Sequence, residues 1–131
     1  MIVAIALSNY PDFNLNSVQV FFDDARSGAN PVTFEAGCRD QGAVAAGLND
    51  AFAIDRLCIV TSNVRLLDDY QNQNGDEVVY VRTFGLSVGS TLNLNGKKLF
   101  YLNEDLPCSN GIRGTVNLQG GELTQIRQAE N

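Results

Sequence analysis

The chain has 131 residues, of which 44% are hydrophobic and 18% are charged, and its formal net charge at pH 7 is −6. These values indicate a single globular domain over residues 1–131 and exclude a disordered chain. The acidic balance argues against nucleic acid and membrane surfaces as partners, because both favour basic proteins. No apolar run approaches the roughly 20 residues of a membrane span, and no secretion signal is evident. We therefore expect either an intracellular chain or one whose signal has been removed.

The first half of the chain alternates short apolar segments with polar turns. Residues 2–7 and 17–22 are predicted strands, and the second of them alternates as a half-buried strand does. Residues 32–35 form a third. The alanine-rich stretch 41–54 has apolar residues near helical spacing and predicts one or two helical turns, broken near Gly47. This half is therefore predicted to be strands with one short helix.

The second half is predicted to contain strands only. Asn95-Gly96 suits a two-residue turn with both φ values positive, so residues 91–94 and 97–102 are predicted to pair as a hairpin. Its two lysines, Lys97 and Lys98, could guard a sheet edge. The other predicted strands are 57–61, 64–67, 77–84, 115–118 and 123–126, the last of which could instead begin a frayed tail.

One pattern occurs three times, at 18–28, 64–75 and 99–111. Each copy is an apolar strand that ends in a pair of acidic or amide side chains, and each is followed by a polar loop that a glycine closes. Many short strands with such turns predict an all-β fold, namely an antiparallel Greek-key sandwich or small barrel with one short helix. Three similar units in a chain of this length also fit a β-trefoil, which stays open as the alternative.

The order of these elements resembles the βγ-crystallin domain. It consists of a strand, an acidic pair, a glycine-closed loop and a short helical crossover, followed by a second such strand. The resemblance covers residues 17–84, with Phe21 to Gly28 matching the outline of the first motif. Leu48-Asn49-Asp50 lies where such domains place a pair of acidic or amide residues before the next strand. The resemblance implies a non-catalytic structural or binding protein that takes calcium as its cation.

The acidic pairs are the candidate metal ligands, because hard cations take oxygen ligands from loops of this kind. Solvated turn formers that cap backbone N–H groups are the other interpretation of the same residues. A site would be built from separate loops, since no run has the spacing of a calcium-binding helix–loop–helix. The candidate ligands are Asp23, Asp24, Asn49, Asp50, Asp68 and Asp69.

Catalysis is not expected. The chain has no histidine, which excludes a Ser-His-Asp or Cys-His site. The cysteines Cys38, Cys58 and Cys108 lack Cys-x-x-Cys spacing, and their odd number argues against a disulfide framework and favours three packed thiols.

Two further functions stay open. A recognition module, such as a lectin or an enzyme inhibitor, could bind a protein or carbohydrate partner through loops such as 106–112. A self-associating subunit of a virion or filament could pair its apolar N-terminal strand with the sheet edge of a neighbour.

Overall fold

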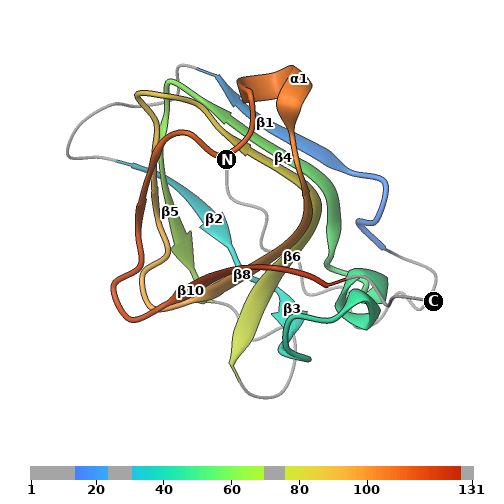
Figure 1. Ribbon diagram of the computed structural model, residues 1–131. Helices are drawn as coiled ribbons and strands as arrows, with labels where there is room; N and C mark the ends of the chain where they lie inside the picture. Colours follow the sequence, from blue (N-terminus) through green and yellow to red (C-terminus); the bar gives the residue numbers. More distant parts are fainter. Residues whose placement is uncertain (1–13, 24–30, 70–75, 128–131) are drawn as a thin grey trace.

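The computed structural model describes residues 14–23, 31–69 and 76–127, and within them the chain is mostly β-strand (Figure 1). A 3-10 helix, η1 (Ala45–Asn49), and one turn of α-helix, α1 (Leu106–Ser109), are the helices of this part of the chain. The strands are β1 (Gln19–Asp23), β2 (Val32–Glu35), β3 (Cys38–Arg39), β4 (Ile54–Val60), β5 (Asn63–Leu67), β6 (Glu77–Leu86), β7 (Thr91–Asn93), β8 (Lys98–Glu104), β9 (Thr115–Asn117) and β10 (Glu122–Gln125).

The strands form two sheets in which the main pairings are parallel. The first sheet has the order β1-β4-β6-β8-β10, with the short β3 antiparallel to β6 at one side. The second sheet has the order β2-β5-β7-β9. All-parallel pairing is typical of α/β proteins, where helices make the crossovers between strands. Here a strand of the other sheet makes each crossover.

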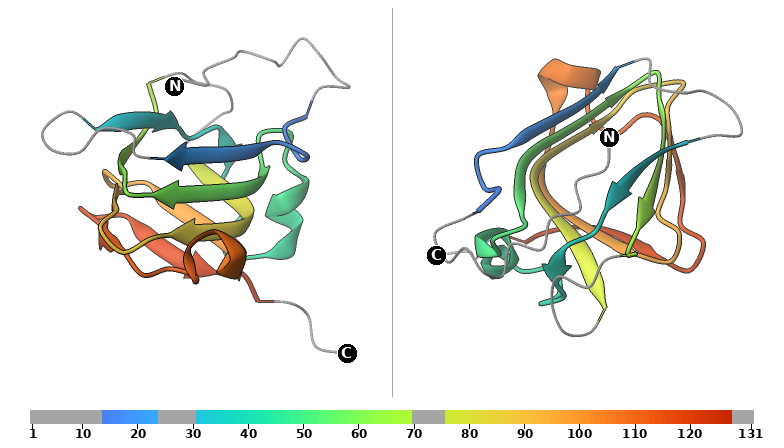
Figure 2. Two further views of the ribbon diagram at one scale, coloured as in Figure 1. Left: turned by 90° about the horizontal axis from the view of Figure 1, so that it is seen from above. Right: turned by 180° about the vertical axis from the view of Figure 1, so that it is seen from behind.

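The chain therefore winds as a coil, in the manner of a parallel β-helix. Leaving β3 aside, it passes from the first sheet to the second and back, so each strand pairs with the strand one full coil further along. Figure 2 (left) shows the strands of the first sheet stacked in chain order from β1 to β10. We number the coils by their strands: β1 with β2, β4 with β5, β6 with β7, and β8 with β9, while β10 begins a fifth.

The core lies between the two sheets and consists of rows of apolar side chains that run along the coil axis. One row on the second sheet joins Val64 to Leu92, both 0% exposed. On the first sheet, Leu57 is in register with Phe84, and both are fully buried. A second cluster, which includes Tyr80 and Leu48, packs η1 against β6. Because successive coils add apolar residues to these rows, the core grows with the number of coils.

The predicted antiparallel Greek-key sandwich or barrel is wrong, and so is the β-trefoil. Both would require consecutive strands to pair with each other, whereas here, β3 aside, each strand is followed by a strand of the opposite sheet. The Greek-key, crystallin-like architecture implied by the resemblance fails for the same reason. The three acidic-pair copies are not structural repeats either, since their strands β1 and β8 belong to the first sheet and β5 belongs to the second.

The turn at Asn95-Gly96 is confirmed, but the hairpin is not. Asn95 has φ 51° and Gly96 has φ 78°, as a turn with two positive φ values requires. Its flanking strands β7 and β8 lie in different sheets, so they do not bond to each other. The turn redirects the chain as predicted, while packing of the apolar side chains decides which strand it meets.

Most of the predicted strands are confirmed with small changes at their ends, among them β2 at 32–35. The predicted helix over 41–54 is reduced to η1, a single 3-10 segment in which Gly47 lies inside the helix. The predicted strand at residues 2–7 lies outside the described residues.

Candidate metal centre

Three carboxylates from separate elements converge at one end of the β2–β5 pair. Glu35 is the last residue of β2, Asp68 follows β5, and Glu77 is the first residue of β6. One carboxylate oxygen of each lies within 4.8 Å of the other two. We call these residues the carboxylate cluster; they come from three successive coils.

The backbone register explains why they meet. Parallel pairing sets Glu35 opposite Leu67, so Asp68 lies one residue past the end of that pair. The main-chain N–H of Ala36 donates to the carbonyl oxygen of Leu67 over 2.7 Å and extends this contact. The N–H of Glu77 donates to Oδ2 of Asp68 over 3.4 Å, which holds the start of β6 beside them. The cluster is therefore positioned by main-chain contacts.

The cluster is shielded from water. Glu35 is 7% exposed and Glu77 is 1% exposed, while Asp68 is half-buried. The Oδ1 atom of Asp68 has almost no exposed surface and accepts no hydrogen bond from the described residues. Negative charges repel one another more strongly where little water separates them. A positive charge among the three carboxylates would remove this repulsion.

The donor set favours a hard cation. Every ligand atom that the cluster offers is a carboxylate oxygen, which suits calcium, magnesium or manganese better than zinc or copper. Calcium–oxygen distances are about 2.4 Å, so two oxygens on opposite sides of one ion lie about 4.8 Å apart. The spacing of the cluster is therefore within the span of a single calcium ion.

Of the six ligands predicted from the sequence, the structure brings only Asp68 into a group of three acidic ligands among the described residues. Asp23, at the end of β1, is exposed, as are Asn49 and Asp69. Asp50 accepts hydrogen bonds from the main-chain N–H groups of Arg39 and Phe52, each over 2.9 Å; the bond from Phe52, two residues along the chain, is that of a turn former. Asp24 lies outside the described residues.

Glu35 and Glu77 were missed because neither belongs to an acidic pair that ends a repeated strand. A signal was present in the sequence, since each is an acid directly attached to an apolar strand: Glu35 ends Val32-Thr33-Phe34-Glu35, and Glu77, after Asp76, begins Glu77-Val78-Val79-Tyr80. An ionisable side chain that enters the core with such a strand needs a partner.

A second buried acid has its partners within the chain. Asp105, 1% exposed, is the N-cap of α1 and accepts the N–H of Cys108 over 3.2 Å. Both of its oxygens also bind Arg56, Nη2 over 2.8 Å and Nε in a short ion pair. This bidentate hydrogen bond raises the pKa of Arg56. The acidic pair 104–105 thus follows the turn-former interpretation.

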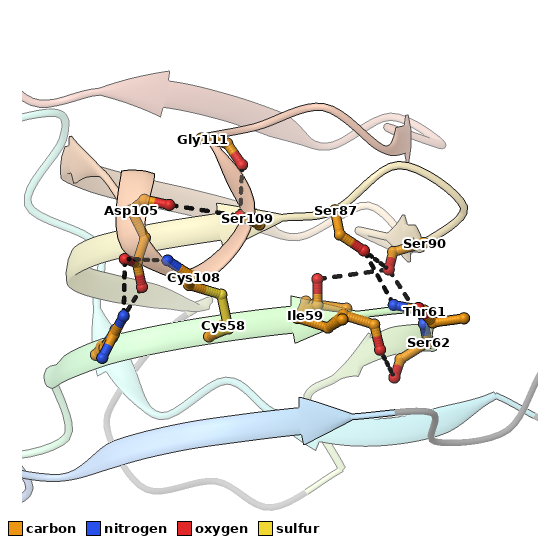
Figure 3. Close-up of a disulfide and its surroundings, with 12 residues drawn as sticks. Cys58, Ile59, Thr61, Ser62, Ser87, Ser90, Asp105, Cys108, Ser109 and Gly111 are labelled. Carbon is orange, nitrogen blue, oxygen red and sulfur yellow. Dashed lines mark hydrogen bonds and ion pairs between the residues drawn. A yellow bond between two sulfur atoms is a disulfide. The ribbon is translucent and has the colours of Figure 1, made fainter.

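A disulfide braces the same region and joins coils that are not neighbours (Figure 3). It links Cys58 of β4 to Cys108 of α1 and crosses β6, where Cys58 is in register with Gly85. A Cβ at Gly85 would lie 2.4 Å from Oγ of Ser109, so only glycine leaves room there. Cys58, Cys108 and Asp105 also lie within metal-binding distance of one another, but the disulfide occupies both sulfurs.

The prediction of three packed thiols is therefore wrong for Cys58 and Cys108 and confirmed for Cys38. Cys38 is 1% exposed and lines an apolar cavity beside Phe34 and Val78. Burial, with a smaller effect of nearby Asp50, raises the pKa of this thiol, so it is protonated and unreactive at neutral pH.

None of the family models, curated proteins or solved structures compared with the chain matches it. Among the described residues, neither helix is long and apolar enough to span a membrane.

Proposed function

We propose that this protein is a non-catalytic structural or binding domain that holds a calcium ion at the carboxylate cluster. The observation that carries the proposal is the convergence of Glu35, Asp68 and Glu77 within 4.8 Å in a site shielded from water. The Oδ1 atom of Asp68, shielded and without a hydrogen bond from the described residues, supplies a further reason for a cation there.

The role of the ion follows from where its ligands sit. Glu35 belongs to the first coil, Asp68 ends the second and Glu77 begins the third. Most contacts in a coiled chain are made between neighbouring coils. An ion bound to all three carboxylates would join three coils at once, so its binding energy would add to the stability of the fold.

The test is calcium binding by protein from which cations have been removed with a chelator. Titration calorimetry should show binding to the wild type, and calcium at about 100 times its Kd should raise the free energy of unfolding by about 2.7 kcal/mol. Asp68→Asn should abolish both effects, because it removes one ligand charge and leaves the size of the side chain unchanged.

Asp69→Asn is the matched control, since Asp69 is exposed, adjacent in sequence and outside the cluster. It should bind calcium as the wild type does. Absence of heat and of any stabilisation in the wild type would refute the proposal, as would equal loss of binding in both variants, which would indicate diffuse attraction to an acidic surface.

A further inference from the structure

The coil ends in two sheet edges at β9 and β10. Both strands are the last members of their sheets, and their described pairings face the preceding coil: β9 pairs with β7 and β10 pairs with β8. Among the described residues, no strand pairs with the opposite edge of either one. Val44 bridges Arg127, beyond the end of β10, and leaves that edge open.

The rows of core side chains also reach this end without being closed. Val116 continues the row of Val64 and Leu92, but it is half-buried where they are 0% exposed. Leu123 continues the row of Leu99 in the same way: Leu123 is half-buried, whereas Leu99 is 0% exposed. Within residues 14–23, 31–69 and 76–127, the end of the coil is therefore an apolar core layer that is covered on one side only.

The edge carries little of the charge that normally protects exposed strands. The whole of β9, Thr115-Val116-Asn117, is uncharged, and it is followed by Leu118, which is 47% exposed. In β10, Glu122 is the one charged residue. Edge strands that stay unpaired usually bear lysines, prolines or bulges. These strands match edges that pair with another chain.

We propose that two copies of the chain associate through the edges of β9 and β10. The occupant follows from the number of edges. In the part of the chain that the structure describes, one edge in each sheet is unpaired at this end, and a single extended peptide would pair with only one of the two. A second copy carries two edges at the same sheet spacing. Contact of this end with itself is isologous, so the assembly closes as a two-fold dimer.

In such a dimer each edge strand meets its own counterpart in the antiparallel sense, which mixed sheets accommodate readily. The half-buried Val116 and Leu123 would be covered by the same residues of the other copy. The dimer does not require calcium, because the carboxylate cluster lies in the first three coils, away from β9 and β10.

The test is the mass of the wild-type protein by sedimentation velocity over a wide range of concentration, with calcium and with chelator. We expect a monomer–dimer equilibrium in both conditions. Thr115→Lys and Thr124→Lys each place like charges near the two-fold axis at positions that are not buried. Each should weaken the dimer by about tenfold or more, because facing like charges are costly.

Gln19→Lys is the matched control, since it adds the same charge to β1, the strand at the opposite end of the first sheet. It should leave the dimer unchanged. A wild type that stays monomeric at all concentrations would overturn the proposal. Open-ended oligomers that all three substitutions weaken would overturn it as well, because they would show head-to-tail stacking of opposite ends.

Discussion

The carboxylate cluster and Asp105 are both acidic and largely buried, and both join coils, yet they differ in the charged side chains that lie beside them. Asp105 is paired with Arg56 and caps α1, so its charge is balanced by the chain itself. In the cluster, Asp68 brings its carboxylate to Glu35 and Glu77, two further acids. The comparison shows that the residues around an acidic side chain, more than its place at a strand end, decide between a structural brace and a candidate metal site.

The largest expected effect comes from removing the internal partner. Asp105→Ala leaves Arg56 without its bidentate acceptor and α1 without its N-cap, and it should lower the free energy of unfolding by about 3 kcal/mol in urea denaturation. Asp105→Asn keeps a capping oxygen and should lose about half as much. A change below about 0.5 kcal/mol in Asp105→Ala would show that the ion pair contributes no net stability.

Removing one acid from the carboxylate cluster should have a smaller effect than Asp105→Ala and, without calcium, should raise stability where Asp105→Ala lowers it. In chelator, Glu77→Gln should stabilise the protein by about 0.5–1 kcal/mol, because it removes one of three repelling charges. In calcium, the same variant should be less stable than the wild type, because it has lost a ligand. Glu104→Gln is the control, since Glu104 accepts a hydrogen bond from the N–H of Ile112 outside the cluster. An unchanged response of Glu77→Gln to calcium would contradict the assignment.

The smallest expected effect on stability comes from an ion pair at the surface. Lys98 binds Asp40 over 2.9 Å, with both side chains partly exposed. Burial acts to raise the pKa of Asp40, but hydrogen bonds from Lys98 and the N–H of Gly42 outweigh it and lower this pKa below its ordinary 3.8. The pair therefore stabilises the fold above that value, and its contribution is lost as the pH falls through the lowered pKa.

Lys98→Met should remove this acid dependence and cost less than about 0.5 kcal/mol at pH 7. Thermal unfolding measured between pH 7 and about pH 2.5 would check both statements. A steeper loss of stability in acid for the variant than for the wild type would contradict the direction of the shift.

The sequence predicted where strands and turns form but not how the strands pair. The alternation in β1 and the positive φ values at Asn95-Gly96 are local properties, and both are present in the structure. Strand pairing depends on contacts one coil away, whereas a hairpin pairs strands that are adjacent in the sequence. A sequence repeat at constant spacing indicates this pairing. The segment Thr91-Leu92-Asn93-Leu94-Asn95-Gly96 recurs 24 residues later as Thr115-Val116-Asn117-Leu118-Gln119-Gly120. The same spacing of 24 residues is the register of β7 with β9 and of β8 with β10.

The candidate metal centre was predictable only in part, for a related reason. Asp68 belongs to an acidic pair and was predicted as a ligand, whereas its neighbours Glu35 and Glu77 come from strands 33 and 9 residues away. Parallel register brings them together, so the set could be assembled only once the coil was known. Asp50 shows the converse, because main-chain N–H groups bind both of its oxygens, one from its own turn at Phe52 and one from Arg39.

The disulfide between Cys58 and Cys108 has a mechanical consequence. Cys58 and Cys108 are 50 positions apart, and the coils between them make up the middle of the molecule. Under tension applied to the two ends of the chain, the outer coils can unwind, but the force passes across the sulfur–sulfur bond and bypasses the enclosed segment. About 170 Å of chain length is thereby withheld from extension for as long as the bond is oxidised. The middle of the coil is a force-shielded segment whose extensibility depends on the redox state.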